Sequence, residues 1–406
     1  MLKNGYFQRR MKIRTDIAVF FFLCLIFQNI VHAQSRMQFS GMSGTMLAHS
    51  TYNRNLDNRK SLGVQFSYLW DLSLDTFSTS KEISKKYVGI SIYGIDMGDG
   101  FLNGDHTARK RLPAMGFATG GMIITGIQRK LQGVMGQSSL GLQFGFGPML
   151  VSKYYDAVKN PANQAIGSRL NFGSQLKLQF THLLSTHSAI GIGAEMFHVS
   201  NTNFQKPNVG LNYLQGNFSF IHLFHGKDAM KKNVRQSFSK KTAIARYQLS
   251  SRAAFRKFRM DYPVNYAVLV LEADYGFQKK YPAAKEHESM YKDPAIEWRA
   301  GLNYFYEMPR SVQTTDGKTL SLEARSELGL YGRALFRMGW VDIFVDLGYY
   351  LIPPKTDRID MLQKNKYIYN AIGSQYRLAK NLFLIHRMKA HFQIADYLEM
   401  GLVYRL

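Results

Sequence analysis

Residues 140–147 read Leu-Gly-Leu-Gln-Phe-Gly-Phe-Gly, so bulky apolar side chains alternate with small or polar ones. Residues 172–180 repeat this alternation, with glutamine and lysine on the second face. Because successive side chains of a strand point to opposite faces, a period of two predicts strands with one apolar and one small or polar face. Helical periodicity is weak throughout, and the chain is expected to be all-β.

The same pattern, followed outward from these two segments, predicts eight strands before residue 226. Breaks rich in Gly, Asn, Asp or Lys separate strands that begin near Met37, Ser61, Tyr87, Met115, Ser138, Leu170, Ser188 and Val209. Eight strands are enough to close a small barrel. Residues 226–241 are basic and polar and predict a linker, and residues 242–406 alternate again over about eight further strands. We expect a barrel over residues 34–225 and a second over residues 242–406, or alternatively one barrel of about sixteen strands.

The amino-terminal residues predict export. Lys12 and Arg14 precede an apolar run over residues 17–31 that ends in a small-residue cleavage pattern, so residues 1–33 are expected to be a signal peptide. The run is shorter than the ~20 residues that a membrane-spanning helix needs, and no later segment is apolar for that length. The only cysteine, Cys24, lies in this run, so the mature chain is expected to lack disulfides and thiol chemistry.

A soluble sandwich and a membrane barrel both show this alternation, because the apolar face forms a core in one and contacts lipid in the other. Export, the length of the strands and the final residues favour the membrane barrel. Residues 399–406, Glu-Met-Gly-Leu-Val-Tyr-Arg-Leu, resemble the polar-x-Gly-x-x-aromatic-x-hydrophobic ending of bacterial outer-membrane barrels. We therefore expect an antiparallel β-barrel in the bacterial outer membrane.

The composition is strongly basic, with 52 Lys and Arg against 28 Asp and Glu and a formal net charge of +24. An exported chain meets little nucleic acid, so nucleic acid is not expected as a partner. A surface rich in lipid phosphates would attract such a chain. A solvated basic surface is the alternative interpretation of the same charge.

The segment that carries chemistry is residues 195–212, Glu-Met-Phe-His-Val-Ser-Asn-Thr-Asn-Phe-Gln-Lys-Pro-Asn-Val-Gly-Leu-Asn, which joins the last two predicted strands of the first half. His198 and Ser200 are two residues apart, so they share one face of a strand with Cβ atoms roughly 7 Å apart. A hairpin symmetric about Gln205 places Asn212 opposite His198, with Cβ atoms about 5 Å apart. This face is the apolar one, where polar side chains cost free energy without partners, so the group calls for a functional explanation.

These residue types suit ester hydrolysis. His198 can take the proton of Ser200, whose hydroxyl is too weakly acidic to attack an ester unaided, and return it to the departing alcohol. Asn212 can hold the imidazole by accepting its other N–H. Asn201 and the backbone N–H groups of the turn through Gly210 are candidate donors to the oxyanion. A strand that runs outward from the periplasm places this group at the outer leaflet.

His-x-Ser-Asn followed by Pro-Asn-x-Gly on the last hairpin of an eight-stranded barrel resembles the active-site hairpin of lipid A 3-O-deacylases (PagL) and acyloxyacyl-hydrolase-like proteins. The resemblance covers residues 34–224. It implies that His198 and Ser200 are the catalytic pair and that Asn201 supports activity. The family's triad is completed by a Glu, whose position is taken here by Asn212, and a neutral amide stabilises an imidazolium less than a carboxylate does.

The resemblance implies a serine ester hydrolase that deacylates lipid A, or a related outer-leaflet glycolipid, through an acyl-serine intermediate at Ser200. Lipopolysaccharide is the expected partner, no metal or organic cofactor is required, and homodimerisation is left open. Two alternatives remain: a non-catalytic porin-like or structural barrel, and a phospholipase. The second half has His391-Phe-Gln at a comparable hairpin and is not expected to be catalytic.

Overall fold

The computed structural model describes sixteen stretches of the chain, all but two short ones belonging to two barrels. They are residues 35–47, 60–71, 84–98, 101–102, 110–111, 116–131, 137–161 with 163, 165–224, 247–256, 266–277, 296–308, 325–337, 341–353, 367–391 and 394–406. Within them no helix is long and apolar enough to cross a membrane. The predicted signal peptide and the predicted linker over residues 226–241 lie outside the described residues and stay predictions.

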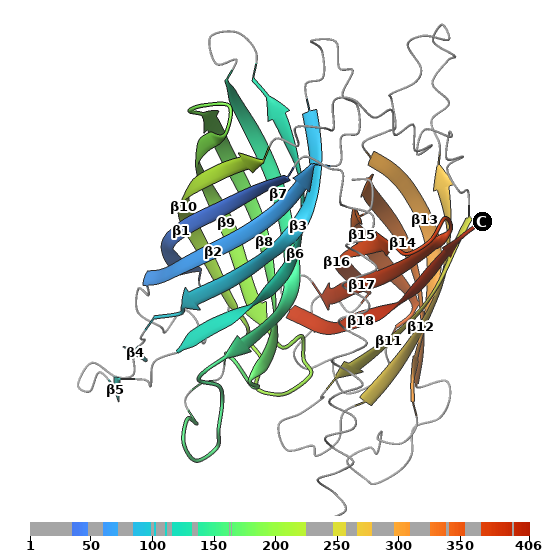
Figure 1. The fold of residues 1–406 in the computed structure, drawn as a ribbon. Helices are drawn as coiled ribbons and strands as arrows, with labels where there is room; N and C mark the ends of the chain where they lie inside the picture. Colours follow the sequence, from blue (N-terminus) through green and yellow to red (C-terminus); the bar gives the residue numbers. More distant parts are fainter. Residues whose placement is uncertain are drawn as a thin grey trace, which may run out of the picture.

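The first barrel closes from eight antiparallel strands (Figure 1). They are β1 (Ser35–Leu47), β2 (Lys60–Asp71), β3 (Ser84–Asp96), β6 (Phe117–Lys130), β7 (Ser138–Val151), β8 (Leu170–Leu183), β9 (Ser188–Ser200) and β10 (Leu211–Phe224). β1 pairs with both β2 and β10, which closes the sheet on itself. A separate short pair, β4 (Phe101–Leu102) and β5 (Lys110–Arg111), stands between β3 and β6 in the sequence.

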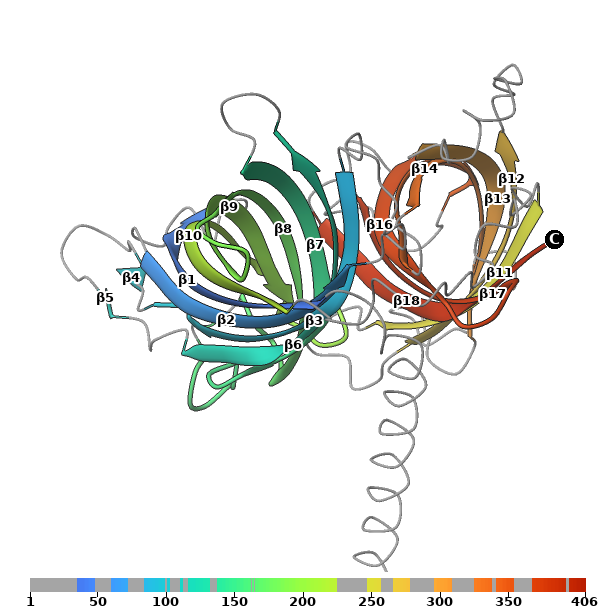
Figure 2. The ribbon, with the colours of Figure 1, turned by 45° about the horizontal axis from the view of Figure 1, so that its top comes forward.

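The second barrel also closes from eight antiparallel strands (Figure 2). They are β11 (Tyr247–Arg256), β12 (Tyr266–Phe277), β13 (Ile296–Glu307), β14 (Ser326–Arg337), β15 (Val341–Ile352), β16 (Ile368–Arg377), β17 (Leu382–His391) and β18 (Ile394–Arg405). β11 pairs with both β12 and β18. The expected all-β fold of two tandem eight-stranded barrels is therefore confirmed, and the alternative of one sixteen-stranded barrel is wrong. The eight predicted strand beginnings of the first half lie within three residues of the observed ones.

Successive side chains of each strand point alternately out of and into its barrel, which explains the period of two in the sequence. Large apolar side chains face outward and are exposed, among them Phe39, Val64, Ile92, Leu142, Leu178, Phe218, Leu302 and Leu347. Polar side chains of the same strands are buried inside. An apolar outer band with a polar interior is the arrangement of a barrel whose solvent is lipid.

The interior of the first barrel has a polar part and an apolar part. In the polar part, the hydroxyls of Ser40 and Ser219 lie 2.8 Å apart and the amide of Gln38 donates to Ser219. The apolar part gathers inward side chains toward the end of the barrel that carries the β9–β10 loop, including Met42, Ile95, Met149, Phe197, Val199, Leu211 and Tyr213. This cluster forms the floor beneath the hairpin that carries the predicted site.

The interior of the second barrel is filled by buried ion pairs and tyrosines. Arg252 contacts Glu399 at 2.6 Å and Glu272 at 2.9 Å. Arg333 contacts Asp346 at 2.7 Å, and both side chains are fully buried. Tyrosines at positions 331, 350, 369 and 397 pack in the same interior. A charge in such a place is stable only with its partners, so the network fills the lumen as a unit.

Candidate functional site

The β9–β10 hairpin positions the predicted site by strand alternation. Its inward residues Phe197, Val199, Leu211 and Tyr213 are all fully buried in the apolar cluster of the first barrel. The residues between them must then face outward, and these are the candidate site residues His198, Ser200 and Asn212. Burial of four large apolar side chains, each stabilising by about 1.5–3 kcal/mol, holds the outward residues in place.

The structure brings these three side chains together in a chain of hydrogen bonds. Asn212 lies directly opposite His198 in the β9–β10 register, as the sequence predicted. The distance between His198 Nδ1 and Asn212 Oδ1 is 2.6 Å, and that between His198 Nε2 and Ser200 Oγ is 2.9 Å.

These contacts assign the protons on the imidazole. Asn212 Oδ1 can only accept, so Nδ1 of His198 carries the hydrogen in this arrangement. Nε2 then presents its lone pair to Ser200 and accepts the hydroxyl proton. This is the tautomer that a general base for a serine nucleophile requires.

Gly210 fits against the site where no other residue would. Its φ is +73°, in the left-handed region that favours glycine. A Cβ at this position would lie 3.0 Å from His198 Cε1 and 3.2 Å from Ser200 Cβ. Gly210 therefore lets the loop close over both side chains, and Ser200 is only 2 % exposed.

Asn201 holds the β9–β10 loop together. Its side-chain Nδ2 donates to the carbonyl of Gln205 at 2.8 Å, and its backbone N–H donates to Asn208 Oδ1 at 3.0 Å. The amide is therefore directed into the loop and not at Ser200, which differs from the oxyanion role expected for it. The N–H of Gly210 is also engaged, with the carbonyl of Ala165 at 3.0 Å.

A different backbone donor lies at the nucleophile. The N–H of Thr202 points at Ser200 Oγ with a separation of 3.4 Å, and the φ of Thr202 is 52°. This left-handed conformation turns the chain back over the end of β9. The sequence carried no signal for it, because threonine rarely adopts this conformation.

The β7–β8 connection braces the site from the side. Gly210 donates its backbone N–H to the carbonyl of Ala165 in this connection. Gly167 also lies against the β9–β10 loop, because a Cβ on it would be 2.1 Å from the carbonyl oxygen of Pro207. Asn163 Oδ1 accepts the N–H of Ile166 at 3.1 Å and fixes this part of the connection. Sequence analysis missed these residues, because a contact between two loops leaves no periodic signal.

Neither Glu195 nor His391 lies beside the candidate site. Glu195 lies on the inward face of β9, where its carboxylate accepts from the amide of Gln175 at 2.6 Å, so it is not beside His198. His391 faces the interior of the second barrel, with its ring stacked near Tyr350. Among the described residues no three His, Cys, Asp or Glu side chains are placed to hold a metal ion.

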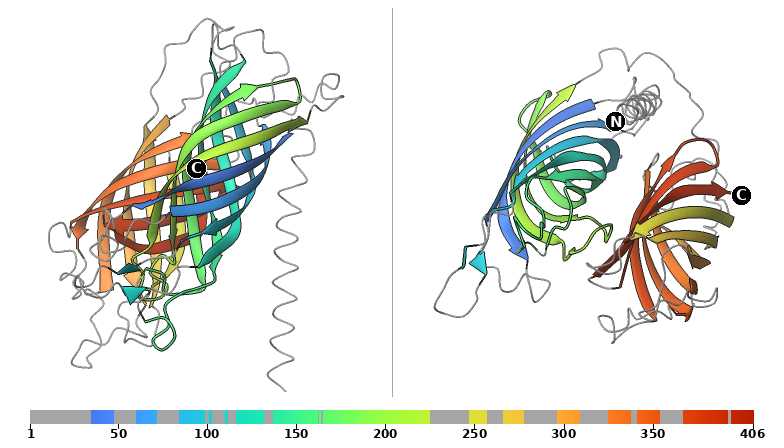
Figure 3. Two further views of the ribbon diagram at one scale, coloured as in Figure 1. Left: turned by 90° about the vertical axis from the view of Figure 1, so that its left-hand side faces the viewer. Right: turned by 90° about the horizontal axis from the view of Figure 1, so that it is seen from below.

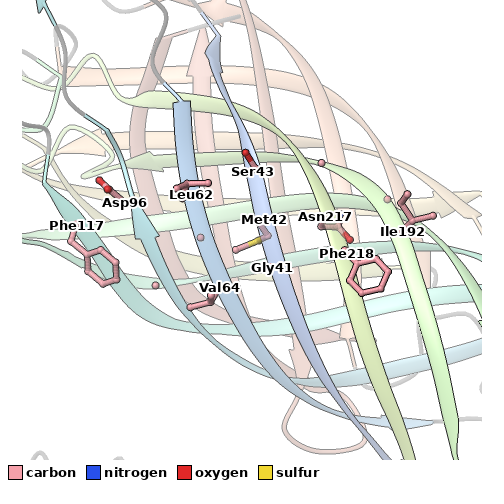
Figure 4. A pocket seen from close by; sticks show the side chains of 14 residues that line it. Gly41, Met42, Ser43, Leu62, Val64, Asp96, Phe117, Ile192, Asn217 and Phe218 are labelled. Atoms are coloured by element: carbon pink, nitrogen blue, oxygen red, sulfur yellow. The ribbon is translucent and has the colours of Figure 1, made fainter.

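An apolar groove of about 840 Å³ lies on the outer wall of the first barrel (Figure 4). It crosses β9, β10, β1, β2 and β3, and small residues form its floor. At Gly41 a Cβ would meet nothing within 4 Å, and at Gly216 only a backbone oxygen at 3.9 Å. Gly216 is four residues from Asn212 along β10, so the groove begins about 13 Å from the hydrogen-bonded group.

Two family models match separate parts of the chain. Residues 48–220 match the family described as lipid A 3-O-deacylase (PagL). Residues 288–406 match the family described as acyloxyacyl hydrolase, C-terminal domain (PagL_C). No curated protein matches the chain.

Several solved structures match part or most of the chain. The crystal structure of the outer membrane enzyme PagL is 14 % identical, covers 45 % of this chain and 97 % of its own, and has a TM-score of 0.30. Neisserial surface protein A (NspA) is 8 % identical, covers 47 % of this chain and 95 % of its own, and has a TM-score of 0.27. A mutant porin of Rh. blastica is 10 % identical, with coverages of 92 % and 100 % and a TM-score of 0.19.

Proposed function

Since the N-terminal half of this chain belongs to the lipid A 3-O-deacylase (PagL) family and the chain is an outer-membrane β-barrel protein, we propose that it is a serine esterase that removes an acyl chain from lipid A. The observation that carries the proposal is the hydrogen-bonded series Ser200, His198 and Asn212 on the outer wall of the barrel. Unpartnered polar groups are costly in an apolar medium, and these three partner one another in the order that nucleophilic catalysis uses.

The proposed reaction begins with Ser200. Its Oγ attacks the ester carbonyl carbon while Nε2 of His198 takes the hydroxyl proton, and the imidazolium is held by Asn212 through Nδ1–H. The tetrahedral oxyanion forms beside the N–H of Thr202, which lies 3.4 Å from Oγ. A stationary donor at that position stabilises the charge without rearranging solvent.

Collapse of this intermediate breaks the ester C–O bond. The departing alkoxide takes the proton from Nε2 of His198 and leaves the acyl chain on Ser200. Water then attacks the acyl-serine, His198 accepts the water proton, and the second tetrahedral intermediate releases the fatty acid and restores Ser200. The two steps together consume one ester and one water, and they need no oxidant, metal or nucleotide.

The setting of the site supports a lipid substrate. Exposed apolar side chains surround it, including Met196 on β9 and Leu214 on β10, and the apolar groove follows below. A chain of net charge +24 favours anionic lipids such as the phosphorylated lipid A. The filled interiors of both barrels weigh against a conducting pore, which was one alternative function.

The decisive experiment measures fatty-acid release and lipid A mass in cells that express wild type, Ser200→Ala or His198→Ala at equal outer-membrane levels. The chain offers a matched control, because Ser138 Oγ and His182 Nδ1 also lie 2.9 Å apart, at the other end of the barrel wall. We expect wild type and Ser138→Ala to remove one acyl chain, and Ser200→Ala to remove none. Identical lipid A in all strains would contradict the proposal.

A further inference from the structure

The two barrels touch through their outer faces. The ring of His386 on β17 stacks on Phe146 of β7, with centroids 4.1 Å apart and an interplanar angle of 17°. Phe144 of β7 packs against Ile343 of β15, and Ile127, Phe336 and Ile372 complete this cluster. Figures 1 and 3 show β7 on the side of the first barrel that faces the second.

Buried polar side chains also lie on the contact face. Ser374 and His386 are opposite one another in the β16–β17 register and both point out of the barrel. They are nevertheless 0 % and 6 % exposed, and the outward Thr125 on β6 is 2 % exposed. Polar side chains facing hydrocarbon are costly, whereas hydroxyls and imidazoles recur where membrane segments meet each other. This face is therefore suited to contact with protein and not with lipid.

The contact lies in the same row of register-paired residues as the candidate site. In the strand registers, Phe146 pairs with Ser174, and Ser174 pairs with His198. Phe146 is thus two strands from His198, about 10 Å along the sheet. Phe172, which is paired with Ser200, stacks on Phe146 with centroids 5.7 Å apart.

We propose that the second barrel is a lateral wall for the lipid substrate of the first. By covering Phe144 and Phe146 of β7 and Ile127 of β6 it blocks the outer wall one strand beyond β8, so that an acyl chain at Ser200 extends toward the other flank, over β10 and β1, where the groove lies. The occupant of this face is the second barrel of the same chain. Contact between the two barrels does not depend on the esterase reaction. The role of the second barrel as a wall for the substrate rests on the proposed esterase function.

Docking is tested without any activity measurement. The only cysteine of the sequence is Cys24, so an introduced pair of cysteines has little competition. The test protein carries Phe146→Cys and His386→Cys, together with a protease site inserted within residues 226–246. Oxidation in intact cells then links the two barrels by a disulfide if they are in contact. After oxidation and cleavage, we expect the two halves to stay linked on a denaturing gel. The control pair is Gly41→Cys with His386→Cys, because β1 lies four strands from β7 in either direction around the barrel. Equal linkage in both pairs would overturn the docking.

The wall role is tested with the double variant Phe146→Ala and His386→Ala, assayed on lipid A and on a short soluble ester that is too small to reach the second barrel. We expect hydrolysis of the short ester to stay at the wild-type rate. The rate of lipid A deacylation relative to that of the short ester should change roughly twofold to tenfold, the factor that corresponds to one lost aromatic contact.

Two outcomes would contradict this. An unchanged ratio of the lipid A rate to the short-ester rate in the double variant would contradict the wall role and leave the esterase proposal intact. Absence of hydrolysis of either ester by wild type would remove both the esterase and the wall role, whereas the crosslinking result would still decide whether the barrels dock.

Discussion

Position 212 is where a single substitution should raise the proposed esterase activity. Asn212 presents both a carbonyl oxygen and an NH2 group, so rotation of the amide by 180° would offer His198 Nδ1 a donor in place of an acceptor. The imidazole would then carry its hydrogen on Nε2, facing Ser200, and could not act as base. Asn212→Asp removes this second orientation, because a carboxylate only accepts, and it retains the side-chain length that gives the 2.6 Å contact.

The expected gain can be worked from that contact. A hydrogen bond to a charged group contributes about 1.5–3 kcal/mol, against about 0.5–1.5 kcal/mol for a neutral one. The difference of about 1–1.5 kcal/mol acts on the imidazolium, which forms only as Ser200 attacks. Asn212→Asp should therefore raise kcat/KM by about tenfold.

The assay is fatty-acid release from purified lipid A by purified, refolded protein, with Asn212→Leu as the matched control of similar volume. Asn212→Leu should lower kcat/KM, because the imidazole then has no partner at Nδ1. If neither variant differs from wild type, Asn212 does not orient His198 and the triad described above is wrong. Asn212→Asp could instead be less active than wild type while Ser200→Ala is inactive. The carboxylate at position 212 would then not stabilise the imidazolium of His198, and the expected tenfold gain would be refuted.

Three further predictions concern other parts of the molecule. Gly210→Ala should abolish ester hydrolysis and leave the barrel folded, judged by heat-modifiable gel mobility, because the new Cβ meets His198 and Ser200 and a left-handed alanine costs about 1–2 kcal/mol. Arg333→Ala should destabilise the second barrel by about 3–5 kcal/mol in denaturant titrations, because Glu272, Asp274 and Asp346 all lose a buried cationic partner. An unchanged transition midpoint would show that Arg387, which also contacts Asp346, compensates for the loss. Gly41→Leu should fold normally, since nothing lies within 4 Å of the new Cβ, and should slow the release of long acyl chains more than short ones.

Strand alternation allowed much of this fold to be predicted. The symmetry of the hairpin about Gln205 predicted that Asn212 would face His198, because a one-residue slip of the second strand would have turned Leu214, Phe218 and Phe220 into the lumen. Alternation is a local property, however, and cannot tell whether the eighth strand closes back on the first or continues to the ninth. The choice between two barrels and one therefore needed the observed pairing of β1 with β10.

The remaining features of the site depend on contacts that no periodicity encodes. Asn201 shares a motif with His198 and Ser200, yet its amide turns into the loop because Gln205 offers a carbonyl there. Ala165 reaches Gly210 from a connection that precedes it by more than forty residues. Phe146 and His386 stack although 240 residues separate them, and each reads in its own strand as an ordinary outward position.

The outward direction of Ser200 also determines how its kinetics must be measured. A nucleophile on the wall of a membrane barrel meets esters that arrive by lateral diffusion, so the quantity that saturates it is the mole fraction of substrate in the bilayer and not a concentration in buffer. Diluting vesicles should leave the turnover per molecule unchanged, whereas diluting lipid A with an inert lipid inside each vesicle should lower it. For the same reason, the stiffness and composition of the outer leaflet become rate-determining variables for this protein, as viscosity is for an enzyme in solution.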